Sequence, residues 1–207
     1  MMSMGTTVDW DALAARYDAQ LWLERRALRA ALDLARPGEE DSFLDVGTGT
    51  GAVLKRLARD AHRPRRALGV DGSPAMLARV GPLPAGWGVL RAGVDSLPLD
   101  AESFDVAVAS YVLHVLDAPA RVPALREIHR VLRPGGALVT VTPALPLPSD
   151  NPLHRRIVRW IERGDGTRRG LLPLDPRALL ASAGFVVESS RRVWLGYPSL
   201  CVRAHRG

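Results

Sequence analysis

The sequence predicts an α/β protein with a doubly wound, mostly parallel β-sheet. Short apolar runs alternate along the chain with segments of helical periodicity, which is the order expected of βαβ units. A glycine-rich loop at 47–51 follows the first apolar run and opens a helix. The last two extended runs, 185–193 and 198–205, are joined only by Leu195-Gly196-Tyr197. Because this join is too short for a crossover helix, the final pair is predicted to be an antiparallel hairpin.

The first half of the chain has clear element boundaries. Residues 9–35 repeat apolar side chains at three- and four-residue spacing, which predicts a helix that Arg36-Pro37-Gly38 ends. Ser73 and Pro74 start another helix, because serine caps helices and proline suits the first helical position. In order, we expect a strand at 42–46, a helix at 52–61, a strand at 67–71, a helix at 73–80, and strands at 87–91 and 104–110.

The second half changes character at Pro143. Before it we expect a helix at 119–132 and a fifth strand at 137–142, separated by Arg133-Pro134-Gly135-Gly136. Residues 143–174 are rich in proline and arginine and form a variable insertion with one amphipathic helix at 151–163. A further helix, from Asp175 to Gly184, precedes the terminal hairpin.

Composition indicates one soluble domain over residues 1–207. The chain is 47% apolar and 24% charged, which is ordinary for a globular protein. Its single cysteine, Cys201, allows no internal disulfide and no cysteine-based metal site, and no other metal-ligand cluster is predicted. Residues 1–7 lack a secretory signal, and no run approaches 18 apolar residues. We therefore expect a cytoplasmic protein without a membrane span.

The net charge of +6 has two interpretations. A basic balance can indicate a nucleic-acid partner. However, Lys55 is the only lysine among 28 basic residues, and abundant Arg, Ala, Gly and Pro is also what a GC-rich genome produces. Charge alone therefore does not favour nucleic-acid binding.

The loop at 47–51 carries the clearest chemical signal. Its glycines permit a tight turn and close approach of a ligand, and the following helix offers free N–H groups. Asp71 ends the second strand, where a carboxylate meets the ribose hydroxyls of an adenosine ligand. The spacing Gly47-x-Gly49-x-Gly51 differs from the dinucleotide pattern, and Asp45 would repel a pyrophosphate. The loop therefore predicts a cationic ligand such as S-adenosylmethionine (SAM).

Five segments resemble class I SAM-dependent methyltransferases in order and spacing, and most closely their ubiquinone/menaquinone-biosynthesis-like small-molecule subgroup. These segments are 43–51, 70–76, 95–98, 103–106 and 131–136. The resemblance covers about residues 40–142 and the terminal hairpin. It implies a Rossmann-like seven-stranded sheet with an antiparallel last strand. It also implies in-line transfer of the methyl group of SAM to a small molecule, leaving S-adenosylhomocysteine (SAH).

The resemblance also implies site residues. Residues 9–36 would form a lid or cap helix that contains Tyr17. By the same resemblance, Asp71 would hold the ribose, Val94 would meet the adenine edge through its backbone, and Ser110 would lie beside the sulfonium. The residues implied at the methionine part and its loop are Asp45, Gly47, Thr48, Gly49 and Gly51.

Two positions depart from the family pattern. The residue after the ribose acid is usually apolar and covers one adenine face, but here it is Gly72. Where members carry an aspartate for the adenine amino group, this chain has Gly93. Asp95 is the nearest acid, on the same side as Gly93 by alternation but without matching its reach, and Met76 is a further candidate for an adenine contact. These departures predict weak SAM binding or a substitute group.

Two features are candidates for action on the acceptor. His114 follows the fourth strand near the expected acceptor and is either a general base or a structural histidine. On the predicted helix at 151–163, Arg155, Arg159 and Arg163 share one face, which is either solvated or part of a cover that attracts an anionic acceptor. RNA contact is a third interpretation of these arginines.

Three functions remain open at this point. The first is a small-molecule methyltransferase. The second is a SAM-fold protein with a degenerate or partner-dependent site and no independent catalysis. The third is an RNA methyltransferase, although Ser110-Tyr111-Val112-Leu113 stands where enzymes that methylate base amines carry an N/D-P-P-Y loop. The acceptor, its reacting atom and the oligomeric state are not predicted.

Overall fold

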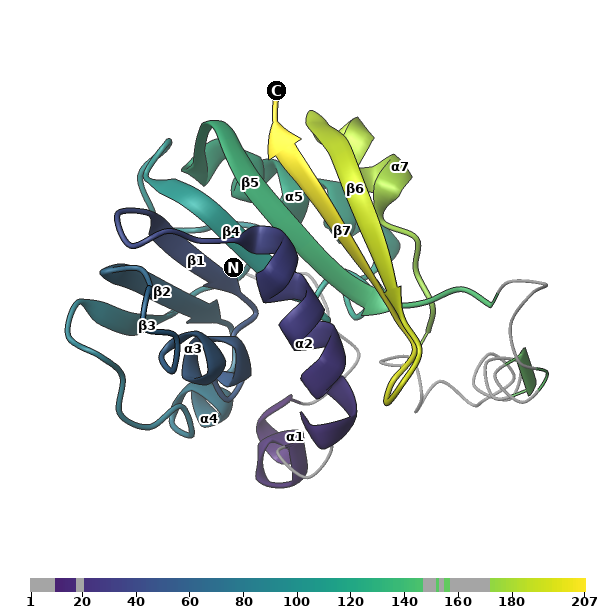
Figure 1. Ribbon diagram of the computed structural model, residues 1–207, viewed down its shortest axis with the longest axis horizontal. Coiled ribbons are helices and arrows are strands. Elements are labelled where there is room, and N and C mark those ends of the chain that lie inside the picture. The colour runs from purple at the N-terminus through teal and green to yellow at the C-terminus, as the bar shows by residue number, and fades with distance from the viewer. Residues whose placement is uncertain (1–9, 18–20, 147–151, 153–154, 157–171) are drawn as a thin grey trace.

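A seven-stranded sheet with the order β3-β2-β1-β4-β5-β7-β6 forms the centre of the computed structural model (Figure 1). The structure describes residues 10–17, 21–146, 152, 155–156 and 172–207. The strands are β1 (Ser42–Val46), β2 (Arg66–Asp71), β3 (Trp87–Arg91), β4 (Phe104–Ser110), β5 (Leu132–Pro143), β6 (Phe185–Val193) and β7 (Ser199–Arg206). The helices are α1 (Trp10–Tyr17), α2 (Leu21–Ala35), α3 (Ala52–Leu57), α4 (Pro74–Leu77), α5 (Ala118–Val131) and α7 (Arg177–Ser182).

The pairing of the strands confirms the predicted sheet. β1 to β5 pair in parallel, whereas β7 is antiparallel to both β5 and β6. β1 lies between β2 and β4, so the strand order reverses there. Ligands of doubly wound sheets bind outside the carboxyl ends of the strands at such a reversal. The topology therefore predicts a ligand site at the carboxyl ends of β1, β2 and β4.

Successive side chains of a strand point to opposite sides of the sheet. Apolar side chains from both sides are buried in two core clusters. On one face, Leu44 and Ala107 belong to a core that includes apolar residues of α5 and α7. On the other face, Phe43 and Val108 pack with α2 and α3. All five residues of β1 are buried, the polar Ser42 and Asp45 as well as the three apolar residues, as expected of a central parallel strand. Figure 1 shows α2 and α5 on opposite sides of the sheet.

The helix predicted over residues 9–35 is corrected to two helices. α1 packs against α4, whereas α2 packs against β4, β5 and β7. The two helices therefore pack on different parts of the protein, α1 on a helix and α2 on the sheet. The helices predicted at 52–61 and 73–80 are shorter, ending at Leu57 and Leu77. Two residues after each end, the amides bond to carbonyls only three residues back, from Arg59 to Arg56 and from Arg79 to Met76, which tightens and ends each helix.

The second half needs three further corrections. β5 begins at Leu132 rather than at 137, because Leu132 is extended, fully buried and paired with Phe104 before an irregularity in the ladder. α5 correspondingly spans Ala118–Val131, and α7 spans only Arg177–Ser182. The helix predicted at 151–163 lies largely outside the described residues. In the described part of the chain, no helix has the length and apolar character needed to cross a membrane.

Candidate functional site

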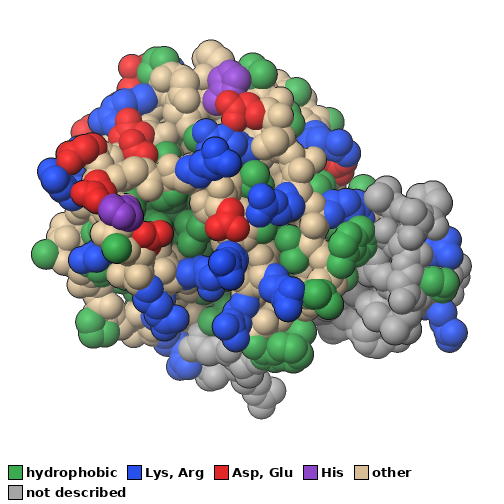
Figure 2. Space-filling model, in the orientation of Figure 1, with side chains coloured by type: hydrophobic (Ala, Val, Ile, Leu, Met, Phe, Trp, Pro, Cys, Tyr) green, Lys and Arg blue, Asp and Glu red, His purple; other side chains and the backbone are tan. Residues whose placement is uncertain are grey.

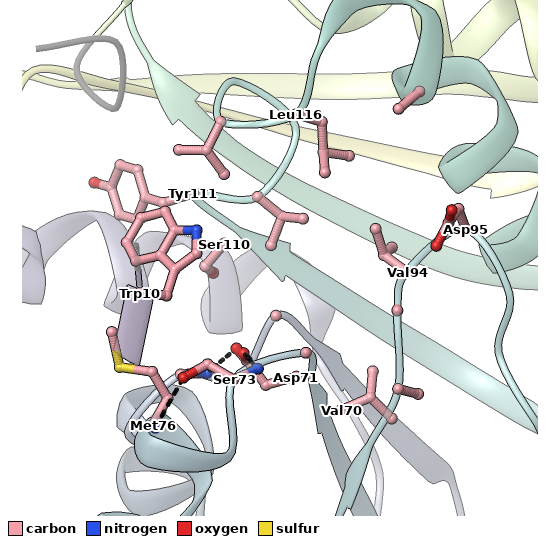
Figure 3. Close-up of a pocket in the computed structure, with 18 of the residues that line it drawn as sticks. Trp10, Val70, Asp71, Ser73, Met76, Val94, Asp95, Ser110, Tyr111 and Leu116 are labelled. Atoms are coloured by element: carbon pink, nitrogen blue, oxygen red, sulfur yellow. Dashed lines mark hydrogen bonds between the residues drawn. The ribbon is translucent and has the colours of Figure 1, made fainter. Parts of the chain in front are cut away.

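A pocket of about 340 Å³ opens at the carboxyl ends of β1, β2 and β4 (Figure 3). Its walls come from α1, the glycine loop after β1, the β2–α4 turn, the loop after β3 and the β4–α5 loop. The lining residues are Trp10, Asp11, Gly47, Gly49, Val70, Asp71, Gly72, Ser73, Met76, Ala92, Gly93, Val94, Asp95, Ser110, Tyr111, Val112, Val115, Leu116 and Ala120. The pocket thus lies at the reversal of strand order.

The glycine loop requires glycine at Gly47. This residue has a positive φ of 65°, which side-chain-bearing residues rarely adopt. A Cβ atom there would also stand 2.3 Å from Cγ2 of Val112 on the β4–α5 loop. The loop and the β4–α5 segment therefore pack directly, and they leave the backbone of residue 47 exposed to the pocket.

Asp71 is fixed by two backbone amides. Its Oδ2 accepts a hydrogen bond from the Gly49 N–H at 2.8 Å, and its Oδ1 accepts one from the Ser73 N–H at 2.9 Å. Burial raises the pKa of Asp71, whereas these hydrogen bonds from Ser73 and Gly49 lower it. Each carboxylate oxygen has a second lone pair. The carboxylate can therefore accept hydrogen bonds from a ligand while it joins the glycine loop to the β2–α4 turn.

Asp45 lies behind the loop rather than on the pocket surface. It is 1% exposed, and its Oδ2 accepts the Thr48 hydroxyl at 2.6 Å. Its Oδ1 has no hydrogen-bond partner within the described part of the chain. Burial raises the pKa of Asp45 to about 7, against the lowering effect of Thr48 and with a raising effect of Asp71. Asp45, Thr48 and Gly51 do not line the pocket, so ligand contact by these three remains a prediction.

The predicted site residues either line the pocket or lie away from it. The predicted residues that line the pocket are Gly47, Gly49, Asp71, Gly72, Met76, Val94, Asp95 and Ser110. Among them, the Ser110 Oγ is buried without a hydrogen-bond partner in the described residues, as expected where a ligand supplies the partner. His114 is 5% exposed and does not line the pocket, although its ring lies edge-on to that of Tyr111. The side chain of Tyr17, at the end of α1, lies outside the described residues.

Met76 and Asp95 stand at different ends of the pocket. Figure 3 shows Met76 on the side of Trp10, whereas Val94 and Asp95 lie at the opposite end. The predicted adenine contacts at Met76 and Asp95 therefore belong to different ends of the pocket, and Val94 lies at the same end as Asp95.

Sequence reasoning missed the contribution of the start of α1. Asp11 Oδ1 accepts hydrogen bonds from the Ser73 hydroxyl and, at 3.3 Å, from the Ala75 N–H. Trp10 lines the pocket beside it. The sequence indicated a lid over 9–36 and a cap at Ser73, but nothing in it connected residues 62 positions apart.

Acidic groups dominate the electrostatics of the pocket. Asp11, Asp71 and Asp95 line it, and its described lining contains no arginine, lysine or histidine. This contrasts with a chain whose net charge is +6. Such a wall attracts a cation and repels phosphate groups. The fold and the pocket together define a Rossmann-like α/β protein with an acidic ligand site at the reversal of its strand order.

Comparisons with known proteins identify the family. Residues 44–140 match the family model described as a methyltransferase domain. A ubiquinone/menaquinone biosynthesis C-methyltransferase of Syntrophotalea carbinolica is 36% identical over 180 residues, covering 82% of this chain and 73% of that protein. A malonyl-[acyl-carrier protein] O-methyltransferase of Halorhodospira halophila is 33% identical over 168 residues, covering 77% of this chain but 53% of that protein. The chain therefore spans about half the length of this second relative.

A solved structure agrees with the fold. The SAM-dependent methyltransferase of Aquifex aeolicus superposes with a TM-score of 0.67 at 21% identity, covering 95% of this chain and 98% of that one. The chain belongs to the class I SAM-dependent methyltransferases and is a methyltransferase enzyme that uses SAM. The residues present fit this cofactor, because the pocket offers carboxylates for a cation and an unpartnered buried Ser110 hydroxyl.

Proposed function

We propose that this enzyme methylates a small aromatic molecule of the quinol type, and that the acidic pocket is its SAM site. The observation that carries the acceptor class is the aromatic wall made by Trp10 and Tyr111. Both residues line the pocket, and Figure 3 shows them at the same end as Ser110. A flat, largely apolar ring packs well against such side chains.

In the proposed arrangement, each part of the cofactor meets one wall. Asp71 accepts hydrogen bonds from the two ribose hydroxyls, while its existing bonds to Gly49 and Ser73 hold it in place. The backbone at Gly47 and Gly49 borders the methionine part. Asp45 and Thr48 support that loop from behind, and Gly51 is the N-cap residue of α3. The adenine lies at the Val94 and Asp95 end, over Gly72.

The protein contributes mainly by orientation and by excluding water. When bound, SAM supplies a methyl group that its sulfonium already makes electrophilic. Trp10 and Leu116 close the pocket from two sides, and α1 is held over α4 by Asp11. Holding two reactants in line replaces an encounter in solution and can contribute up to about 7–11 kcal/mol in favourable models. We assign no proton transfer to His114, because it lies behind the pocket surface.

The two other candidate functions have weaker support. A degenerate site is disfavoured because the contacts of Asp71 with Gly49 and Ser73 are intact. An RNA substrate is disfavoured because the pocket wall is acidic, and because acidic and basic side chains are interspersed on the face shown in Figure 2. The predicted arginine cover at 151–163, with its anionic acceptor, falls largely outside the described residues and carries no weight here.

The test is methyl transfer from radiolabelled SAM to two acceptors, a demethylated menaquinol analogue and a malonyl thioester. These represent the acceptors named for the two curated relatives. We expect label on a ring carbon or hydroxyl of the quinol. Transfer to the malonyl carboxyl alone would overturn the quinol assignment. A folded protein that binds neither SAM nor SAH in calorimetry would overturn the pocket itself as the cofactor site.

A further inference from the structure

The turn between β6 and β7 packs against the start of α2 (Figure 1). The Tyr197 N–H donates to the Leu23 carbonyl at 2.9 Å, and a Cβ on Gly196 would stand 2.2 Å from the same oxygen. Further along both elements, Arg191 of β6 pairs with Asp33 of α2 at 3.5 Å. The hairpin and α2 therefore form one continuous surface.

Exposed apolar side chains gather around this turn. Trp22 and Leu195 are 67% and 62% exposed, and Trp194 and Leu145 are exposed as well. Arg192 joins the last two, because it donates to the Leu145 carbonyl at 2.6 Å and its guanidinium lies 4.5 Å from the centroid of the Trp194 ring. Four of the six large apolar side chains that are exposed in the described part of the chain therefore lie at one place.

The neighbouring face of α2 is basic. Its exposed side chains are Trp22, Arg25, Arg26, Arg29 and Asp33. The three arginines follow Trp22 by three, four and seven positions, so all four side chains share one face of the helix. Burial lowers the pKa of the Arg56 guanidinium on α3, and the nearby charges of Arg29 and Arg25 lower it further. Acids also occur on this side of the molecule, but Figure 2 shows basic side chains grouped over α2.

A bilayer with anionic headgroups matches both parts of this surface. Tryptophan favours the membrane–water interface, and leucine can enter the boundary of the acyl chains. Arginine is attracted to anionic headgroups and keeps its charge among them. RNA bases could stack on the indoles, but they offer no stacking partner for Leu195. A second copy of this chain, related by a two-fold axis through this face, would bring arginines against arginines.

We propose that this surface docks the enzyme onto a bilayer that contains anionic phospholipid. We call it the Trp–Arg surface, and it consists of Trp22, Arg25, Arg26, Arg29, Trp194 and Leu195. It adjoins the pocket, because the Tyr111 hydroxyl lies 2.6 Å from Oγ of Ser199 at the start of β7, and the Tyr111 ring lies 5.9 Å from that of Tyr197. Docking therefore holds the Tyr111 end of the pocket beside the lipid headgroups. The inference goes beyond the proposed function and does not depend on the identity of the acceptor.

The experiment is flotation of the full-length protein with lipid vesicles on a density gradient. Vesicles of phosphatidylcholine with about 30% phosphatidylglycerol are compared with vesicles of phosphatidylcholine alone. We expect at least about tenfold stronger binding to the anionic vesicles at low salt. Most of this binding should be lost at about 500 mM salt, because screening weakens the attraction of the arginines.

Two sets of substitutions test the two parts of the surface. Trp22→Ser/Leu195→Ser should weaken binding at least about tenfold, because it removes the side chains that leave water. Arg25→Gln/Arg26→Gln/Arg29→Gln should weaken binding about 100-fold, since each arginine contributes about fivefold at an anionic surface. Matched controls on other surfaces should stay within about threefold of the wild type. These controls are Val89→Ser/Val186→Ser and Arg63→Gln/Arg65→Gln/Arg126→Gln.

Indole fluorescence reports insertion directly. With anionic vesicles, the emission of the wild type should shift to shorter wavelength, because Trp22 and Trp194 leave water. The shift should disappear in Trp22→Phe/Trp194→Phe, which keeps apolar rings at both positions. An unchanged shift in that variant would overturn insertion by this surface.

The outcomes are separable from those that concern the cofactor site. All variants of the Trp–Arg surface should bind SAH as the wild type does in calorimetry, because none of the substituted residues lines the pocket. Wild-type protein that binds SAH but does not float with anionic vesicles would overturn the docking proposal alone. Binding of a single-stranded oligonucleotide that depends on the three arginines, without vesicle binding, would overturn it in favour of RNA.

Discussion

Replacing Asp71 with alanine should abolish tight cofactor binding. We assign two ribose hydroxyls to this carboxylate, and a hydrogen bond to a charged group contributes about 1.5–3 kcal/mol. Loss of both therefore costs about 3–6 kcal/mol, which raises the dissociation constant for SAM by about 10²- to 10⁴-fold. The assay is calorimetric titration with SAM, alongside Asp100→Ala as a variant with the same change in charge.

The same substitution also removes the acceptor for two backbone amides, those of Gly49 and Ser73. A buried amide left unpaired costs about 1–3 kcal/mol, so the melting temperature should fall as well. Asp71→Asn keeps one acceptor oxygen and should show an intermediate loss of affinity. A folded Asp71→Ala protein that binds SAM within threefold of the wild type would refute the ribose assignment.

Three further predictions concern pH, the open adenine face and the glycine loop. Burial raises the pKa of both Glu24 and Asp45 to about 7. The folded state thus holds protons that the unfolded chain releases near pH 4, and the free energy of unfolding should fall as pH rises from about 4 to about 7. Denaturant titrations should show a smaller fall in Glu24→Gln, and an identical slope would contradict this explanation. Gly72→Leu should lower the dissociation constant for SAH about three- to tenfold by covering the base, since burying one methylene contributes about 0.8 kcal/mol. Among the described residues other than 71–73, the nearest atom to the added Cβ is the Ala92 carbonyl oxygen at 3.9 Å, so weaker binding in calorimetry would count against the proposed position of adenine. Gly47→Ala should lower the melting temperature through its clash with Val112 and its positive φ, and a melting temperature equal to that of the wild type would show that the loop can relax.

Much of the fold could be predicted because its signals are local. The strand β1, the glycine loop and the start of α3 are contiguous in sequence, and the short join before Ser199 sufficed to predict the hairpin. β5 was placed too late because Arg133-Pro134-Gly135-Gly136 has the composition of a turn. Leu132 belongs to β5 because it pairs with Phe104, which lies 28 residues earlier in the chain. A local sequence pattern does not predict such a pairing.

The candidate site was predictable to the same degree. Asp71 follows a strand at a fixed distance from the loop, so its place in the pocket could be read from spacing. The contact of Asp11 with Ser73 depends on where α1 packs, and periodicity in α1 does not contain that information. The alternation used for Asp95 assumes an extended chain, whereas the Ser96 N–H donates to the Gly93 carbonyl and residues 93–96 turn.

The carboxylates of the pocket bear on turnover as well as on affinity. SAM carries one more positive charge than SAH, so in the proposed cofactor site the wall formed by Asp11, Asp71 and Asp95 should attract SAM more strongly than SAH. Loss of the sulfonium charge on methyl transfer should therefore weaken the binding of SAH in that site. Added salt screens that difference, so exchange of SAH for SAM should become less favourable as ionic strength rises.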